Sequence, residues 1–155
     1  MGFFDVEKRS HLKVEQLLSN ATQKGARVVL GGKRDPQSTC FKPTLLINVT
    51  NDMDIAHTEI FGPVIAIQKF ETEEEVLALA NHCRTGLAGY IFTTDYAQIL
   101  RVSRSLQVGI IGVNEGMVSC AEAAFGGIKE SGLGREGGSQ GIDEFSQWKY
   151  VCVGF

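Results

Sequence analysis

The sequence predicts an α/β fold in which short parallel strands alternate with helices. Residues 63–114 give the clearest support, because a strand, a helix, a strand, a helix and a strand follow one another there with short connections. Such alternation is typical of a parallel sheet with right-handed crossovers. The glycines, 18 in 155 residues against 3 prolines, stand where elements are expected to end. A chain of this length buries enough surface for a core, and we treat it as one unit.

The first part of the chain is expected to contain one helix and three strands. Residues 5–24 place apolar side chains at helical spacing, and Gly25 stands where this helix should stop. The apolar side chains are Val14, Leu17, Leu18 and Ala21. Strands are expected at 26–30, 41–49 and 63–70, with a turn and a short helix over 50–60. Pro43 near the start of the second strand predicts a sheet edge, because proline has no N–H to donate to a neighbouring strand.

A second helix is expected directly after residue 71. Thr72 is placed as its N-cap, and Glu75 three residues later completes the pattern of a capping box. Gly86 follows its last turn. One apolar face is formed by Val76, Leu79, Ala80 and Cys83. This spacing predicts that Cys83 is a core residue.

The third helix is expected to begin at Asp95, a preferred N-cap residue, and to close at Gly109. It presents Ile99, Val102 and Leu106 on one face. A buried strand is expected before it at 87–93, and the next strand follows it at 110–114.

After Asn114 the regular pattern ends in a glycine-rich stretch, residues 115–141, before a final strand at 148–153. Irregular segments this long are usually functional or disordered, and ligands of α/β proteins bind beyond the carboxyl ends of parallel strands. This loop is therefore the leading candidate site. Residues 132–137 match G-x-G-x-x-G, but no strand precedes them and no acidic residue follows at the required distance. We predict a tightly turned loop there rather than a phosphate cradle.

Composition excludes several classes of protein. Lys and Arg total 15 against 18 Asp and Glu, and both signs are scattered, which argues against a nucleic-acid partner. No apolar run approaches the ~20 residues of a membrane span, so no membrane partner is expected. The four cysteines form no close pair and there are 3 histidines, so we expect neither a disulfide framework nor a metal site. Free thiols favour a reducing, intracellular compartment.

Residues 59–63 read Glu-Ile-Phe-Gly-Pro and lead directly into an expected strand. A rigid Gly-Pro bend holds a carboxylate and a ring at fixed positions, where the carboxylate can accept hydrogen bonds from vicinal hydroxyls. From the residues alone, a structural turn is the simpler interpretation.

With residues 125–137, Phe-Gly-Gly-Ile-Lys-Glu-Ser-Gly-Leu-Gly-Arg-Glu-Gly, the motif resembles the C-terminal portion of an aldehyde dehydrogenase, closest to the succinate-semialdehyde dehydrogenase branch. Further matches lie at 24–28, 31–33, 41–45, 72–75, 86–90, 113–116 and 149–152.

The resemblance implies an oxidoreductase. In that family a cysteine thiolate attacks the aldehyde, hydride passes to NAD or NADP, and water releases the acid. It implies that the Glu59 carboxylate holds the nicotinamide ribose hydroxyls and that Phe61 packs beside the cofactor. It also implies that Phe125 lines the aldehyde tunnel and that Ser119 binds the substrate carboxylate, in a loop that Asn114 helps to shape.

The resemblance further implies a portion of the parallel-sheet catalytic domain over residues 1–147, and a strand at 148–155 for pairing with a neighbouring subunit in a homo-oligomer. The family's nucleophilic cysteine, general base and Rossmann domain have no match in these residues, so no catalytic residue is assigned. None of Cys40, Cys83, Cys120 and Cys152 matches the nucleophile.

Two functions are therefore weighed. The first is part of an enzyme that oxidises succinic semialdehyde or a similar aldehyde with NAD or NADP, the 155 residues alone being inactive. The alternative is a naturally short, non-catalytic protein of the same type that binds partner chains through its last strand. A free-standing thiol enzyme using Cys120 is disfavoured, because no base or cation stands beside it to lower its pKa. For the compartment, the mitochondrial matrix and the cytoplasm both remain open.

Overall fold

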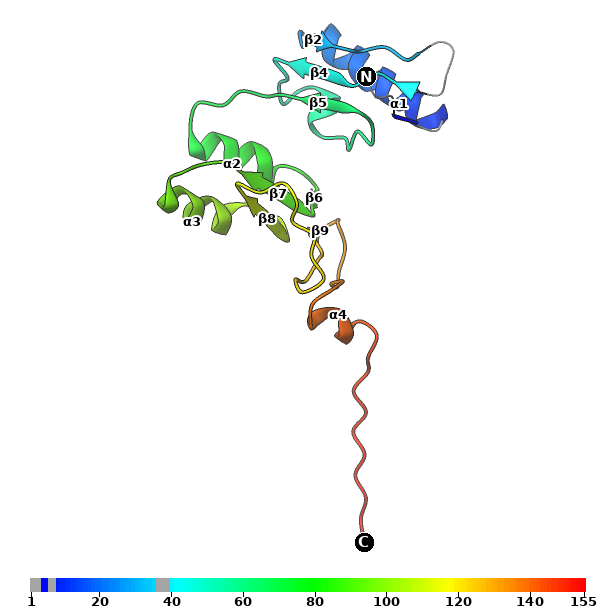
Figure 1. Cartoon of the computed structure of the whole chain (residues 1–155), viewed down its shortest axis with the longest axis vertical. Coiled ribbons are helices and arrows are strands. Elements are labelled where there is room, and N and C mark those ends of the chain that lie inside the picture. The colour runs from blue at the N-terminus through cyan, green and yellow to red at the C-terminus, as the bar shows by residue number, and fades with distance from the viewer. Residues whose placement is uncertain (1–3, 6–7, 36–39) are drawn as a thin grey trace. The chain divides into compact units, whose positions relative to one another are not determined.

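A computed structural model of the chain describes residues 4–5, 8–35 and 40–155, with side chains from His11 onward in these ranges. The chain divides into two compact units, Met1–Glu73 and Glu74–Phe155, which are described separately here (Figure 1). Both mix helices and strands, which confirms the α/β content predicted from the sequence. The expected boundary between residues 147 and 148 stays a prediction.

The first unit packs one long helix against a three-stranded sheet. Its elements are β1 (Phe4–Asp5), α1 (Lys8–Gln23), β2 (Arg27–Leu30), β3 (Cys40–Phe41), β4 (Thr44–Ile47), η1 (Asp54–Ala56) and β5 (Val64–Ala66). The apolar face predicted for α1 is confirmed, because all four of its residues lie in one buried cluster with β3, β4 and the η1 turn. The buried residues of this cluster are Val14, Leu17, Leu18, Ala21, Ala26, Phe41, Leu46, Val49, Met53 and Ile55.

The expected edge position of the strand after Pro43 is wrong. The predicted strand 41–49 is two strands, β3 and β4, and β4 is the central strand of the sheet β2-β4-β5. It pairs antiparallel with β2 and parallel with β5. Pro43 lies between β3 and β4, so its missing N–H removes no bond from the sheet, and Thr44 N resumes pairing by donating to Pro63 O at 2.8 Å.

The second unit contains a parallel strand pair connected through a helix. Its elements are α2 (Glu73–Asn81), β6 (Thr85–Gly86), β7 (Ala88–Ile91), α3 (Tyr96–Ser105), β8 (Ile110–Val113), β9 (Ile128–Lys129) and α4 (Gln140–Asp143). β7 and β8 pair in parallel from Ala88–Ile110 to Ile91–Val113, as the alternation of elements predicts. The three predicted parallel strands do not form one sheet in the described structure, because β5 belongs to the sheet β2-β4-β5 and β7 pairs with β8.

Helix α3 begins as predicted, because Asp95 Oδ1 accepts hydrogen bonds from Ala97 N at 2.8 Å and Gln98 N at 3.2 Å. It ends earlier than expected. Leu106 turns to an extended backbone with ψ 123°, although its N–H still reaches Val102 O, so the helix stops before Gly109. Gly109 instead lies directly before β8.

Several residues of this unit that were predicted to be buried are exposed. Helix α2 ends at Asn81, which leaves Cys83 beyond its apolar face, exposed and 3.1 Å from the Thr85 hydroxyl. The strand expected to be buried at 87–93 exposes 49% of Tyr90 and 71% of Phe92. The physical reason is that β7 and β8 form a sheet of only two strands, and α3 contributes one buried side chain, Val102.

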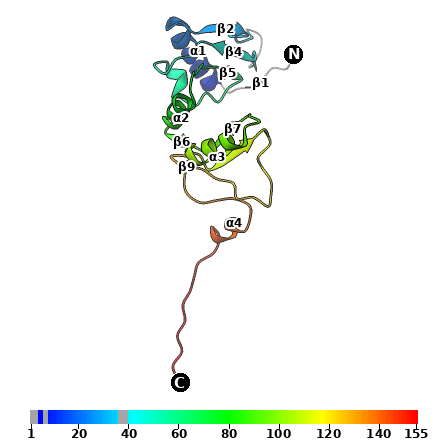
Figure 2. The same ribbon diagram turned by 90° about the vertical axis from the view of Figure 1, so that its left-hand side faces the viewer.

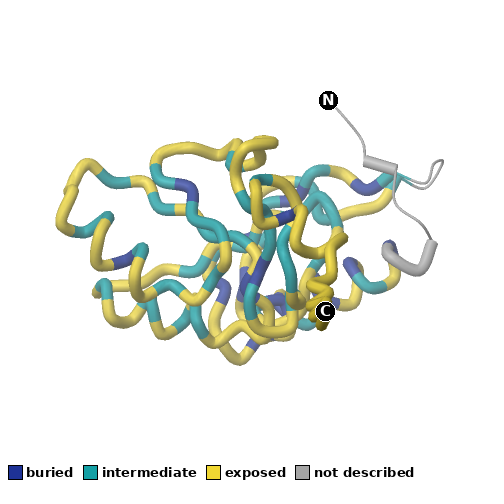
Figure 3. The backbone as a smooth tube through the Cα atoms, turned by 90° about the horizontal axis from the view of Figure 1, so that it is seen from below, coloured by how far each residue is buried: buried dark blue, intermediate teal, exposed yellow. Residues whose placement is uncertain are grey.

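The last residues form no strand in this structure. The chain runs extended beyond α4 (Figures 1 and 2), and every residue from 142 to 155 is exposed (Figure 3). A strand needs a hydrogen-bonded neighbour, and the described residues supply none to 148–153. None of the helices in the described part of the chain combines the length and apolar character needed to cross a membrane.

Candidate functional site

The turn that carries Glu59 and Phe61 joins η1 to β5 in the first unit. Both side chains are exposed, the Phe61 ring to 75%. Phe61 adopts a left-handed backbone with φ 46°, which costs a non-glycine residue of order 1 kcal/mol. A Cβ added to Gly62 would lie 2.7 Å from Val14 Cγ2, so only glycine lets the turn lie this close to the buried face of α1. The turn is therefore anchored at Gly62 and presents Glu59 and Phe61 outward.

Ser119 and Phe125 lie in the loop after β8, in the second unit, and line one cleft of about 410 Å³. Ser119 is exposed, whereas Phe125 is half-buried. Their shared cleft is completed by Cys120, Ala121, Glu136 and Gly137. The structure thus brings together the two residues that the sequence assigned to substrate, while Glu59 and Phe61 belong to the other unit.

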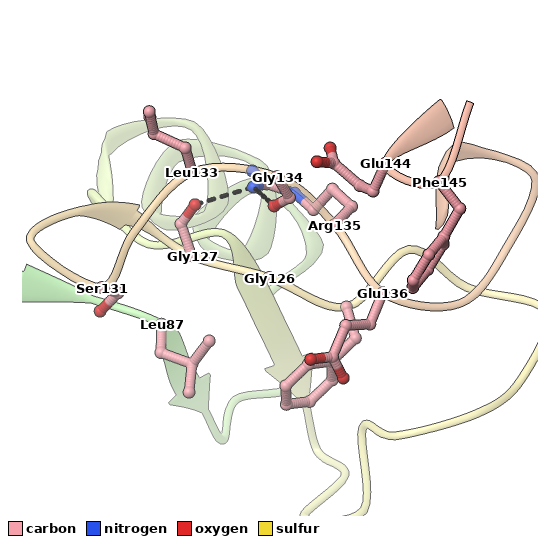
Figure 4. A pocket seen from close by; sticks show the side chains of 11 residues that line it. Leu87, Gly126, Gly127, Ser131, Leu133, Gly134, Arg135, Glu136, Glu144 and Phe145 are labelled. Carbon is pink, nitrogen blue, oxygen red and sulfur yellow. Dashed lines mark hydrogen bonds between the residues drawn. The ribbon is translucent and has the colours of Figure 1, made fainter. Parts of the chain in front are cut away.

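Phe125 also lines a second cleft of about 270 Å³, drawn in Figure 4. The lining residues that the sequence reasoning missed come mainly from the glycine-rich segment and from the two residues that follow α4. They include Leu133, Gly134, Arg135, Glu136, Glu144 and Phe145. Residues 132–137 are a turned loop, with φ 109° at Gly132, 81° at Gly134 and 67° at Gly137, as predicted. The sequence offered one signal for these missed residues, which was the single arginine, Arg135, between the closely spaced glycines Gly134 and Gly137.

The backbone of Phe125 is held by pairing with Glu136. Phe125 N donates to Glu136 O, and Glu136 N donates to Phe125 O, both at 2.7 Å. The two residues form an isolated antiparallel bridge that closes residues 125–136 into one loop. Phe125 therefore has a defined backbone position although its ring is outside any core.

Within residues 4–5, 8–35 and 40–155, the structure shows no group of three or more His, Cys, Asp or Glu side chains placed to hold a metal ion. None of the four cysteines, all of which lie in the described part of the chain, is in a disulfide; Cys40 is half-buried and the other three are exposed. His57 Nε2 lies 2.5 Å from Asn51 O, within its own turn. The two clefts that Phe125 lines are bordered by hydroxyls, carboxylates, one thiol and one guanidinium, from Ser119, Ser131, Glu136, Glu144, Cys120 and Arg135.

Comparison with known proteins decides the family. The model of the aldehyde dehydrogenase family matches residues 6–151, almost the whole chain. The chain belongs to the aldehyde dehydrogenase family. It is 52% identical over 150 residues to the mitochondrial succinate-semialdehyde dehydrogenase of Homo sapiens, and 48% identical over 143 residues to that of Oryza sativa subsp. japonica. These alignments cover 96% and 92% of this chain but 28% and 27% of the relatives.

Solved aldehyde dehydrogenase structures show the same fold. The succinate-semialdehyde dehydrogenase from Burkholderia pseudomallei is 43% identical, with a TM-score of 0.91 over 94% of this chain and 30% of that one. The NAD+ complex of the aldehyde dehydrogenase from Bacillus cereus is 36% identical, with a TM-score of 0.86 over 92% of this chain and 29% of that one. The chain therefore spans less than a third of the length of the family members it matches.

Proposed function

We propose that these 155 residues are the C-terminal part of the catalytic domain of an NAD- or NADP-dependent dehydrogenase that oxidises succinic semialdehyde, or a similar aldehyde, to the acid. The observation that carries the proposal is the 52% identity over 150 residues to the human succinate-semialdehyde dehydrogenase. A second support is that Ser119 and Phe125 line one cleft. In the intact enzyme this chain supplies one wall of the cofactor and substrate sites.

The substrate wall consists of Ser119 and Phe125. A hydroxyl donates a hydrogen bond to a carboxylate, and Ser119 is exposed in the cleft with its hydroxyl available for that contact. The half-buried Phe125 ring offers an apolar surface to the chain of the aldehyde. A short aldehyde that carries a carboxylate matches this pair of side chains.

The cofactor wall consists of Glu59 and Phe61. An ionised carboxylate accepts hydrogen bonds from both hydroxyls of a ribose, and an exposed aromatic ring two residues away offers a flat apolar face. Both side chains are exposed on a turn that Gly62 anchors, so the residues present fit the nicotinamide ribose. When bound, the cofactor supplies the hydride acceptor. The residues of this chain bind and orient it.

No residue of the chain is assigned to the chemical step. The exposed thiols of Cys83, Cys120 and Cys152 match no family nucleophile, and only Cys120 lines a cleft described here. We infer that the 155 residues alone do not turn over an aldehyde.

The final residues are proposed to pair with a neighbouring subunit of a homo-oligomer. Their apolar side chains are exposed, including 103% of Trp148 and 88% of Tyr150, and such surface is usually covered by a partner. The same observation favours the alternative function, a non-catalytic family member that binds partner chains. The relatives are named as mitochondrial, which supports a mitochondrial location. We propose the matrix, with the cytoplasm as the alternative.

A chimera tests the proposal. This chain replaces the matching segment of the human succinate-semialdehyde dehydrogenase, and production of the reduced cofactor is followed with succinic semialdehyde and NAD+ or NADP+. We expect turnover by the chimera and none by the 155 residues alone. A folded but inactive chimera favours the binding protein. Turnover by the 155 residues alone contradicts the absence of a nucleophile, and Cys120→Ala would then be the first variant to assay.

A further inference from the structure

Arg135 makes contacts that the proposed function does not use. Its Nη1 donates to the carbonyl oxygen of Gly127 at 2.9 Å and to that of Gly134 at 2.6 Å (Figure 4). Residues 125–127 form one arm of the loop and residues 134–136 the other, with the Phe125–Glu136 bridge between them. One guanidinium nitrogen therefore links the two arms.

The first arm is packed closely on its other sides. A Cβ added to Gly109 would lie 2.0 Å from Gly126 O, so the carbonyl of this arm lies directly against the start of β8. Gly127 is buried, and a Cβ on it would lie 2.5 Å from Ser131 Cβ and 3.0 Å from Gly86 O. On the side toward Arg135, the arm is held by the hydrogen bond from the guanidinium to Gly127 O and by the Phe125–Glu136 pairing.

Arg135 also packs along the arm that it bonds. A Cβ on Gly126 would lie 2.6 Å from Arg135 Cδ, so the aliphatic part of the arginine lies against Gly126 while its guanidinium reaches Gly127. The planar, permanently charged guanidinium donates several hydrogen bonds in fixed directions, whereas a lysine offers one compact ammonium on a flexible stem. The position therefore favours arginine over lysine.

We propose that Arg135 is a positioning residue that fixes the Phe125 ring as the wall shared by the two clefts. Without the hydrogen bonds of Arg135, the Phe125–Glu136 backbone pair loses the contacts beside it, and the Phe125 ring samples more orientations. This inference rests on the proposed function, in which Phe125 lines the aldehyde-binding cleft. Arg135 thereby sets how well that cleft selects and holds the aldehyde.

Amide hydrogen exchange tests the positioning without any activity. In the full 155-residue chain, Arg135→Met is expected to speed exchange at the Phe125 and Glu136 amides by about tenfold, with the β7–β8 amides unchanged. Arg135→Lys should fall between. The matched control is Arg84→Met, which removes an exposed ion pair with Glu130 of 2.8 Å in the same unit. Equal exchange in Arg135→Met and the control overturns the inference, as does a loss of protection spread evenly over β7 and β8.

Steady-state kinetics of the chimera provide the second measurement, which also decides the matter should the Arg135→Met chain fail to fold. We expect the aldehyde KM to rise about tenfold, with kcat and the KM for NAD(P)+ within about twofold, and Arg135→Lys to recover part of the loss. A fall in kcat with both KM values unchanged overturns the positioning role. Faster exchange at Phe125 with an unchanged aldehyde KM supports the effect of Arg135 on the loop. That result refutes the substrate role proposed for Phe125. An inactive parent chimera refutes the proposed function. The exchange result still decides whether Arg135 holds the backbone of Phe125 in place.

Discussion

The side-chain amide of Asn114 pairs with the backbone of Thr93 in the manner of one more residue of a strand. Thr93 N donates to Asn114 Oδ1 at 2.9 Å, and Asn114 Nδ2 donates to Thr93 O at 2.8 Å. The pair lies directly beyond Ile91 and Val113, where the β7–β8 ladder ends. Asn114 has φ 53°, so the chain turns away there into the loop that holds Ser119 and Phe125.

Replacing this amide should destabilise the fold. Asn114→Ala loses both hydrogen bonds and places alanine in a left-handed backbone, so we expect the free energy of unfolding to fall by about 1–2 kcal/mol. Urea unfolding followed by far-UV circular dichroism measures the change. Glycine adopts the same φ without strain, so Asn114→Gly should recover only the part of the lost unfolding free energy that comes from the left-handed backbone. An alanine variant as stable as the parent chain would show that the amide pairing contributes nothing.

Gly109 is expected to tolerate no side chain. A Cβ there would lie 2.0 Å from Gly126 O and 2.8 Å from Gly127 Cα, both backbone atoms that cannot rotate away. Gly109→Ala should therefore lower the free energy of unfolding by about 1–3 kcal/mol, the usual range for overpacking. Gly116→Ala is the matched control, because a Cβ at Gly116 meets nothing within 4 Å. Similar melting temperatures for the two variants would contradict the close packing of β8 on the loop.

Asp52 should show a pH-dependent contribution with a definite sign. The Thr50 hydroxyl donates to Asp52 Oδ1 at 2.5 Å and holds the pKa of this carboxyl below its ordinary value, with a smaller contribution from Lys24. A pKa lowered by folding means that the ionised carboxylate stabilises the fold above its ordinary pKa. That contribution is lost as the pH falls through the lowered pKa.

Thr50→Val removes the main cause and is expected to raise the pKa of Asp52 toward its ordinary value. Carboxyl carbon shifts followed by NMR across acidic pH measure the change directly. Lys24→Met, which removes an ammonium 3.8 Å from Asp52 Oδ2, should give a smaller rise. A larger shift in the lysine variant would reverse the assigned order of causes.

Glu59→Gln should weaken use of the cofactor in the chimera. The neutral amide keeps the shape of the side chain but loses a charged acceptor, and hydrogen bonds to charged groups contribute about 1.5–3 kcal/mol. We expect kcat/KM for NAD(P)+ to fall by about tenfold or more, with a smaller change in the aldehyde KM. Glu15→Gln, at an exposed position of α1, serves as the control. Equal kinetics in the two variants would remove Glu59 from the cofactor wall.

The final residues are expected to drive self-association of the 155-residue chain. Sedimentation velocity over a range of concentrations should show an oligomer whose fraction falls when residues 148–155 are deleted. Val151→Pro removes a backbone N–H that an intermolecular ladder needs, whereas Val151→Thr retains it and should associate like the parent. A parent chain that remains monomeric, with a sharp thermal transition independent of concentration, would contradict the pairing.

Local sequence patterns predicted the features that depend on the spacing of residues within one element. The apolar spacing of α1 predicted its buried face, and Asp95 predicted the start of α3, because capping bonds reach only two or three residues ahead. The motif at 59–63 indicated a rigid turn, and the structure places its glycine against Val14 as such a turn requires.

The errors concern relationships between distant segments. Pro43 suggested an edge, but which strand is central depends on the pairing of β4 with β2 and β5. Cys83 fitted a helical stripe, but the helix stops at Asn81, where Lys129 Nζ donates to Asn81 O at 2.8 Å and to Cys83 O at 3.0 Å. A side chain 46 residues away from Cys83 therefore bonds the backbone at the end of this helix.

The sequence by itself indicated the family and the starts of α2 and α3, because these depend on residue types at short, fixed spacings. The four site residues remain predictions that the family resemblance implies. Only the tertiary structure showed that Phe125 lies on a loop closed by Glu136 and bridged by Arg135. The reason is physical: the hydrogen bonds of that loop are made to backbone carbonyls and amides, which every residue possesses. Their pairing is decided by how closely the glycines allow the segments to approach, and this appears only when the chain is folded.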